Sequence, residues 1–177
     1  PRGAGRGVVV TPLSPAQAER LGQVFTLRLG AGAHDAPSPG QPPTDGALCV
    51  MEATAYIAGE PWSDAPTCAC PILGAFMRAW NDGLPQEDRD RLLSPLVPRL
   101  VGSRSSPAVE ERRAYLAIDW LVRTHTPAWL SLVESCEPHA AALRALAPIT
   151  DLASAAAAGA DTRAAKAAAR AAAFASA

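Results

Sequence analysis

Apolar residues along most of this chain recur at helical spacing, and proline and glycine divide them into short segments. The clearest case is the range 107–123, where Val109, Leu116, Trp120 and Leu121 fall on one face of a helix. A Ser-Pro pair begins this range, and proline is favoured in the first turn because its missing N–H has no helical partner there. The pattern predicts an amphipathic helix.

The same punctuation predicts further helices. They begin at Ser14-Pro15, span 47–58, span 71–80, begin at Pro85, span 126–134 and run from Pro138 to before Pro148. Gly59 is expected to end the helix over 47–58, with Thr44 or Asp45 as its N-cap. Residues 24–29 give a weak strand signal, and Val8–Val10 an extended one. We predict a mainly α fold: a compact helical bundle with a short extended N-terminal segment and an alanine-rich C-terminal helix.

The changes in composition along the chain predict three regions. Residues 1–23 form an N-terminal arm, residues 24–150 a helical domain and residues 151–177 an alanine-rich helical tail, weakened at Gly159. Four residues of the tail fall three and four apart on one stripe: Arg163, Lys166, Arg170 and Phe174. The stripe is either a solvated helix face or an interaction surface for an acidic or self-complementary partner.

Overall composition narrows the class of protein. Hydrophobic residues make up 49% of the 177 residues, which is enough for a core, and the net charge is −1. A nucleic-acid-binding protein usually shows a basic face, so we expect no nucleic-acid partner. No apolar run reaches the roughly 18 residues that a membrane span needs. Four cysteines in this length do not indicate a disulfide scaffold, so we expect a cytoplasmic protein.

Glu52 is the most informative polar residue, because the helix predicted around it is apolar on nearly all sides. A buried carboxylate must be hydrogen-bonded or paired, and such groups often occur at functional sites. The structural alternative is that Glu52 accepts backbone N–H bonds or pairs with an arginine such as Arg78. Candidate catalytic partners for Glu52 are Asp64, Cys68 and His34.

The cysteines and one histidine suggest a metal site as an alternative. Its candidate ligands are His34, Cys49, Cys68 and Cys70. The close pair here is Cys-x-Cys, whereas zinc sites usually use pairs separated by two to four residues, so ordinary buried cysteines are the simpler interpretation. Cys70 is also a candidate reactive thiol, because it precedes a predicted helix start. We predict no cofactor, with zinc as the alternative.

No sequence motif fixes a reaction. His125 and His139 are expected on the surface, and Asp119 and Arg123 are expected to form an ion pair within one helix. The predicted core consists of Leu48, Met51, Ile57, Ile72, Phe76, Leu116, Trp120 and Leu121, with Trp80 and Trp129 as further anchors.

The central segment resembles an uncharacterised family of bacterial and phage proteins. The resemblance rests on Met51-Glu52-Ala53, the run Tyr56–Glu60, Trp62-Ser63-Asp64 and Pro66 with Cys68, and it extends over residues 25–147. Members of this family often end in long alanine-rich stretches, as this chain does. The resemblance implies no activity that can be named. Ala65 stands where the family pattern has histidine, which implies that any site using that histidine is impaired here.

The sequence therefore favours a non-enzymatic helical interaction or assembly module that acts through its C-terminal helix. Its partner would be another protein or a second copy of the chain. The alternative is a small metal-binding or hydrolytic enzyme with a site around Glu52, Asp64, Cys68 and His34. The sequence by itself does not decide whether the chain is an enzyme.

Overall fold

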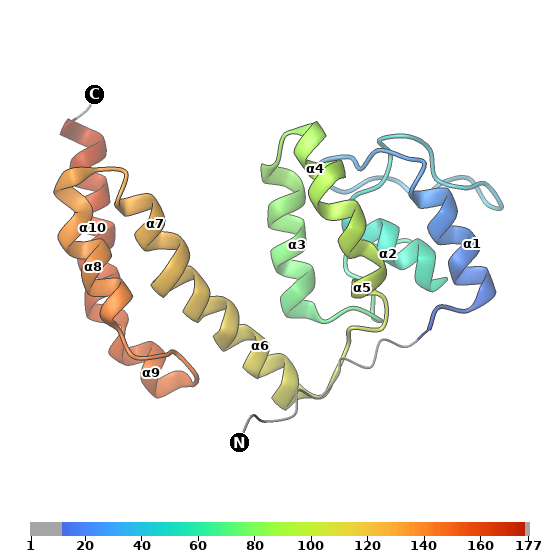
Figure 1. Cartoon of the computed structure of the whole chain (residues 1–177). Helices are drawn as coiled ribbons and strands as arrows, with labels where there is room; N and C mark the ends of the chain where they lie inside the picture. Colours follow the sequence, from blue (N-terminus) through green and yellow to red (C-terminus); the bar gives the residue numbers. More distant parts are fainter. Residues whose placement is uncertain (1–11, 176–177) are drawn as a thin grey trace, which may run out of the picture. The chain divides into compact units, whose positions relative to one another are not determined.

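The computed structural model describes residues 12–175, and in this range the chain is helical with no β-strand (Figure 1). The predicted mainly α class is confirmed. The elements are α1 (Pro15–Val24), α2 (Val50–Ala58), α3 (Pro71–Gly83), α4 (Gln86–Leu93), η1 (Ser94–Leu96), α5 (Val97–Leu100), α6 (Pro107–Trp120), η2 (Leu121–His125), α7 (Thr126–Leu130), η3 (Glu134–Cys136), α8 (Glu137–Ala145), α9 (Leu152–Ala157) and α10 (Gly159–Ala175). Proline occupies one of the first two positions of many of these helices, as the sequence predicted.

The chain divides into two compact units, Pro1–Ser105 (unit 1) and Ser106–Ala177 (unit 2). These boundaries differ from the expected ones. Leu21 and Val24 of α1 pack into the core of unit 1, so the described part of the expected arm belongs to that unit. Helix α10 packs on α8 and η3, so the alanine-rich tail is an integral part of unit 2.

Helix α2 is the centre of unit 1, where α1, α3 and α5 contact it. Most of its apolar residues are buried because these helices and the preceding loop surround it, and Tyr56 and Ala58 are half-buried. Gly59 ends α2 in a left-handed conformation (φ 76°), as predicted. The N-cap is Cys49, not Thr44 or Asp45, because the helix begins at Val50. Asp45 instead pairs with Arg28 at 2.8 Å.

The N-terminal predictions have a mixed outcome. Ser14 caps α1 and forms a capping box with Gln17, which confirms the predicted helix start. The predicted strand at 24–29 is wrong: α1 ends at Val24, and a turn follows in which the Leu27 N–H donates to the Val24 carbonyl at 3.0 Å. Val8–Val10 lie outside the described residues.

Unit 2 is built on α6, α7, α8 and α10, with η2 joining α6 directly to α7. Its core is small and partly made of alanine, comprising Leu130, Cys136, Ala140, Leu143 and Ala165. The predicted pair of Asp119 and Arg123 is confirmed at 3.0 Å. Asp119 also accepts the Ile149 N–H at 2.8 Å, which connects α6 to the segment before α9.

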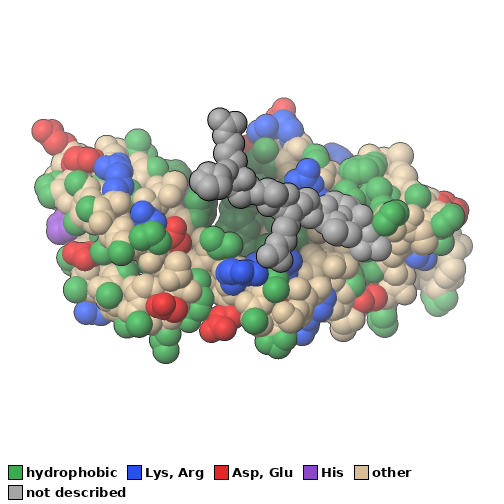
Figure 2. Space-filling view, turned by 60° about the horizontal axis from the view of Figure 1, so that its bottom comes forward, with side chains coloured by type: hydrophobic (Ala, Val, Ile, Leu, Met, Phe, Trp, Pro, Cys, Tyr) green, Lys and Arg blue, Asp and Glu red, His purple; other side chains and the backbone are tan. Residues whose placement is uncertain are grey.

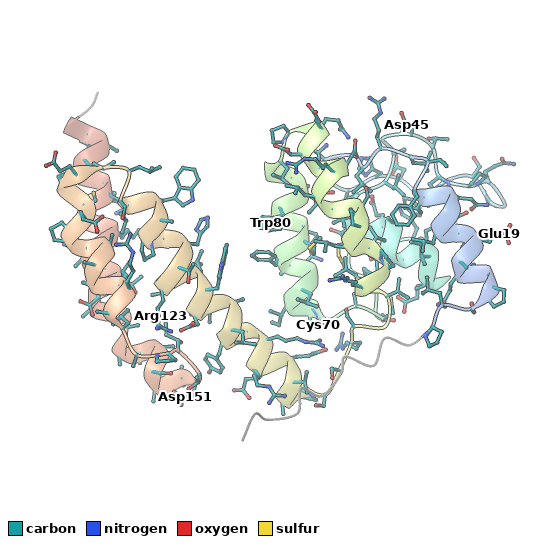
Figure 3. All side chains as sticks on the ribbon, viewed as in Figure 1. Glu19, Asp45, Cys70, Trp80, Arg123 and Asp151 are labelled. Atoms are coloured by element: carbon teal, nitrogen blue, oxygen red, sulfur yellow. The ribbon has the colours of Figure 1, made fainter. Side chains whose placement is uncertain are left out.

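Several predicted core residues are exposed in the structure. Leu48, Met51 and Ile57 are buried as expected, and Ile72 is half-buried. The exposed ones are Phe76 (37%), Trp80 (41%, labelled in Figure 3), Leu116 (64%), Trp120 (40%), Leu121 (48%) and Trp129 (63%). Helical periodicity shows which side chains share a face, but it does not show whether another element covers that face.

Within residues 12–175, no helix has both the length and the apolar character that a membrane crossing requires. On the face of the molecule drawn in Figure 2, acidic and basic side chains are interspersed among hydrophobic ones.

Candidate functional site

Glu52 lies at the centre of a buried hydrogen-bond network in unit 1. Its side chain is 1% exposed. One carboxylate oxygen accepts the His34 backbone N–H at 2.6 Å, and the other accepts the Cys49 N–H at 2.7 Å and contacts His34 Nδ1 at 2.8 Å. All of these neighbours are able to donate, so the negative charge of Glu52 is compensated by the loop and the N-terminus of α2.

His34 is held in place from the other side as well. Its carbonyl accepts the Trp62 indole N–H at 2.9 Å. A Cβ atom on Gly30 would collide with the His34 imidazole and the Gly46 carbonyl, so only glycine fits at that position. The structure therefore brings together two of the predicted catalytic candidates, His34 and Glu52, in an arrangement that fastens the loop over α2.

A second network, centred on Asn81 and Arg89, fixes the start of the same loop. Asn81 accepts the Val50 N–H at 3.1 Å and donates to the Gly30 carbonyl at 2.8 Å. Arg89 is 6% exposed and donates to the backbone carbonyls of Asn81 at 2.6 Å and Leu84 at 2.8 Å. The sequence does not predict that Asn81 or Arg89 is buried. The only signal of their burial in the sequence is that each is a polar residue next to the apolar face of a helix.

Asp64 and Cys68, the other predicted catalytic candidates, lie outside the Glu52 network. The Asp64 carboxylate lies 3.9 Å from the Arg78 guanidinium, and Arg78 also donates to the Asp64 carbonyl at 2.9 Å. Arg78 thus pairs with Asp64 and not with Glu52. Ala65 lines a small cleft of about 130 Å³ beside the start of α3, together with Cys70 and Arg78.

The four cysteines are free thiols, and most of them are buried. Burial, with the nearby charge of Glu52 adding to it, raises the pKa of the Cys49 thiol to about 12. Burial also raises the pKa of Cys68. Cys70 precedes α3 (Figure 3) and is 0% exposed, which removes it from contact with reagents in solution. Among the described residues, no group of three His, Cys, Asp or Glu side chains is arranged to hold a metal ion.

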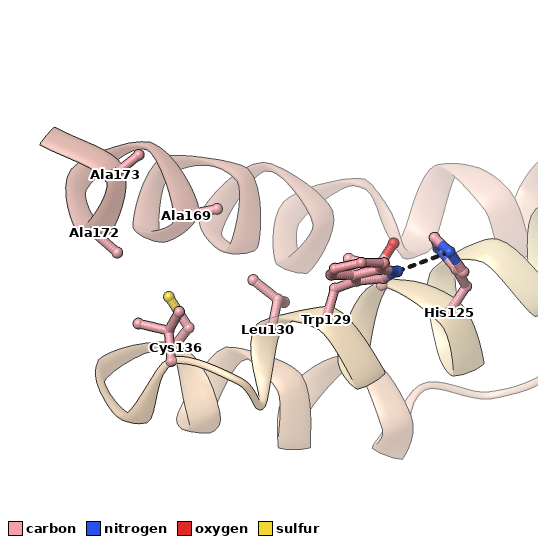
Figure 4. A pocket seen from close by; sticks show the side chains of 9 residues that line it. His125, Trp129, Leu130, Cys136, Ala169, Ala172 and Ala173 are labelled. Carbon is pink, nitrogen blue, oxygen red and sulfur yellow. Dashed lines mark hydrogen bonds between the residues drawn. The ribbon is translucent and has the colours of Figure 1, made fainter. Parts of the chain in front are cut away.

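Unit 2 contains an open apolar groove of about 460 Å³ between α7 and α10, which we call the α7–α10 groove (Figure 4). Leu130 and Cys136 form its buried floor, and Trp129, 63% exposed, forms part of one wall. The residues lining it are His125, Thr126, Trp129, Leu130, Val133, Cys136, Ala169, Ala172 and Ala173. Its volume falls within the roughly 300–1,000 Å³ range of ligand-binding clefts in proteins.

The groove exists because α10 presents only methyl groups toward α7. Ala169, Ala172 and Ala173 are too short to fill the space above Leu130 and Val133. A protein interior is normally packed without such gaps, because unfilled space forfeits dispersion contacts. The alanines therefore leave apolar surface on α7 exposed that a larger side chain would cover.

The π-helical turn η2 arranges an aromatic row at the edge of this groove. In an α-helix, side-chain neighbours are three or four residues apart, but the wider π turn brings Trp120 and His125 together with ring centroids 5.0 Å apart. The Trp129 indole then donates to His125 Nε2 at 3.0 Å (Figure 4). This bond requires Nε2 to be unprotonated and orients Trp129 along the groove wall.

The predicted interaction stripe on α10 is exposed. Arg163, Lys166 and Arg170 are all accessible, and Phe174 is 83% exposed. The sequence predicts Trp129 in the core and His125 on the surface, and it does not predict the groove. The signal for the groove in the sequence is that one face of the C-terminal helix consists of alanine. Such a face cannot fill the space opposite a helix that carries tryptophan.

Comparison of the chain with protein-family models, with curated proteins and with solved structures gives no match.

Proposed function

We propose that this chain is a non-enzymatic helical interaction module that binds an apolar segment of another protein, or of a second copy, in the α7–α10 groove. The observation that carries the proposal is the open groove itself, with Trp129 exposed over a buried floor of Leu130 and Cys136. Aromatic side chains next to apolar pockets are the residues that most often dominate binding energy at protein interfaces.

The Glu52 region supports the enzymatic alternative less well than the groove supports an interaction module. Both oxygens of Glu52 already accept N–H groups of the loop and of α2. Asp64 pairs with Arg78 and lies outside this network. A general base needs a free lone pair directed at a substrate, so this arrangement favours a structural role for the carboxylate.

The proposal can be tested by filling the groove without removing any contact. Ala169→Leu places a larger apolar side chain on the wall of α10, and leucine is nearly as good a helix former as alanine. Ala171 is exposed on α10 and does not line the groove, so Ala171→Leu is a matched control with the same change of residue. Trp129→Ala supplies a second groove variant.

The experiment selects helical peptides from a display library against the purified chain of 177 residues. We expect enriched peptides that carry an apolar stripe, because an amphipathic helix can lay such a face into a groove. Their binding should be lost in Ala169→Leu and Trp129→Ala and kept in Ala171→Leu. Sedimentation of the same variants over a range of concentrations tests self-association through the groove. Absence of both peptide binding and groove-dependent self-association would refute the proposal.

A further inference from the structure

We infer that the segment bound in the α7–α10 groove is an acidic amphipathic helix, an inference that rests on the proposed function. The first observation is the position of the basic residues relative to the groove. Lys166 precedes Ala169 by three residues and Ala173 by seven, and Arg170 precedes Ala173 by three. These are same-face spacings, so Ala169 and Ala173 each have a basic neighbour one turn away on α10.

The charge along this edge of the groove has a single sign. Lys166 and Arg170 are exposed, as is Arg163 one turn earlier. No acidic residue occurs after Asp161 in the described part of α10. A helix lying in the groove would bring one flank over this basic edge, so glutamate or aspartate on that flank would be attracted to it.

The wall of the groove opposite α10 has no lysine or arginine among its lining residues. This difference in charge between the two walls gives the bound helix an orientation. His125, Trp129 and Val133 line that wall, and the Trp129 N–H is already donated to His125. Glu134 follows Val133 and is exposed. The acidic flank of a partner therefore belongs on the α10 side, and its apolar stripe faces the floor.

The same charges argue against a symmetric dimer formed through this groove. In a two-fold dimer whose axis crosses the groove, the Lys166 and Arg170 edge would lie close to the same edge of the second chain. If the axis runs along the groove, this edge would face the opposite wall, and no acidic residue lines the groove there. Like charges brought together at an interface disfavour the complex. The N-terminal residues 1–11 contain Arg2 and Arg6 and no acidic residue, so they do not supply the complementary charge either.

The test uses the full chain and three synthetic helical peptides that share one leucine stripe. Their flanking positions are glutamate in the first peptide, glutamine in the second and lysine in the third. Affinity is measured by calorimetry at low and at high salt. We expect the glutamate peptide to bind at least about 10-fold more tightly than the lysine peptide at low salt, with a smaller ratio at high salt because exposed charges are screened.

Charge reversal provides the decisive variant. In the double variant Lys166→Glu with Arg170→Glu, the preference should change to the lysine peptide. Arg112 is exposed on α6 and does not line the groove, so Arg112→Glu changes net charge in the same unit as a control. That control should keep the preference for the glutamate peptide, and circular dichroism should show that each variant is folded.

The possible outcomes separate the inference from the proposal on which it rests. Binding of all three peptides with equal affinity, blocked by Ala169→Leu, would overturn the acidic partner and leave the interaction module standing. Self-association that Ala169→Leu abolishes, without peptide binding, would replace the acidic helix with a second copy. Absence of peptide binding and of self-association would overturn both.

Discussion

The two units of this chain differ in the polar groups that they bury and in how much apolar surface they leave exposed. Unit 1 buries Glu52, Asn81 and Arg89 and surrounds each with hydrogen-bond partners. Unit 2 leaves large apolar side chains such as Trp129 and Leu132 exposed, at 63% and 74%. Its core relies on small residues of α8 and α10, so there is less apolar surface to cover what α7 presents.

This contrast shows which features are available for function. A buried polar group whose partners all lie within the chain stabilises one conformation and has little capacity left for a ligand. An apolar surface that nothing in its own unit covers still has free energy to gain from a partner. The polar residues that suggested chemistry therefore lie in unit 1, within these networks, and the proposed binding surface lies in unit 2 beside the alanine-rich helix α10.

The largest expected effect comes from removing a core side chain of unit 2. Leu143 is 0% exposed, so Leu143→Ala should destabilise the protein by about 2–5 kcal/mol, through lost burial and a cavity. Leu116 is 64% exposed, and Leu116→Ala should change stability by less than about 0.5 kcal/mol. Denaturant unfolding measures both, and hydrogen exchange should localise the Leu143 effect to α7, α8 and α10. Similar losses for the two variants would mean that Leu116 is buried.

The next effect concerns the polar network of unit 1. Glu52→Ala leaves the N–H groups of His34 and Cys49 without their acceptor and should cost about 2–3 kcal/mol. Glu52→Gln should also destabilise, because its amide NH₂ would face an N–H donor in either orientation. Glu19 is exposed on α1 (Figure 3), and Glu19→Gln serves as the matched control, with a change below about 0.5 kcal/mol. A fully stable Glu52→Gln variant would contradict the structural role of this carboxylate.

A smaller effect should appear at alkaline pH. Burial raises the pKa of Cys49 from an ordinary 9.0 to about 12, so the folded state holds this proton more tightly than the unfolded state does. This contribution to stability is complete below pH 9 and is lost as the pH rises toward 12, with roughly 1 kcal/mol lost by pH 10.

The Cys49 effect is measured as the difference between two titrations of unfolding free energy. Cys49→Ser keeps a side chain able to cap α2 and does not ionise in this range, so its stability should fall less steeply above pH 9. Alkylation of native protein at pH 8 should leave Cys49 unmodified until denaturant is added. Parallel pH curves for the two proteins would show that Cys49 does not titrate differently on folding.

The smallest expected effect on stability comes from the groove. Trp129 is mostly exposed and its hydrogen bond to His125 lies at the surface, so Trp129→Ala should cost only about 0.5–1 kcal/mol. Ala169→Leu should be neutral or stabilising, because it fills space in the groove. Thermal unfolding checks both variants. A loss comparable to that of Leu143→Ala would mean that the groove wall is part of the core, which would remove the contrast between the two units.

The sequence by itself determined the local features of this protein. Ser14 as an N-cap, Gly59 as a left-handed helix end, proline-led helix starts and the pair of Asp119 and Arg123 all depend on residues within four positions of one another. Such features follow from backbone geometry and short-range hydrogen bonds, which the residue types specify directly. The burial of Glu52 was also predictable, because its helix has no polar face.

Only the tertiary structure decided which distant residues meet. His34 and Glu52 are 18 positions apart and Val50 and Asn81 are 31 apart, and no periodicity links them. Leu116, Trp120 and Trp129 have the spacing of core residues, yet they are exposed, because burial depends on the elements packed around them. The α7–α10 groove is likewise a property of two helices together: alanine on α10 is a local choice, but it leaves a hollow only because Leu130 and Trp129 lie opposite.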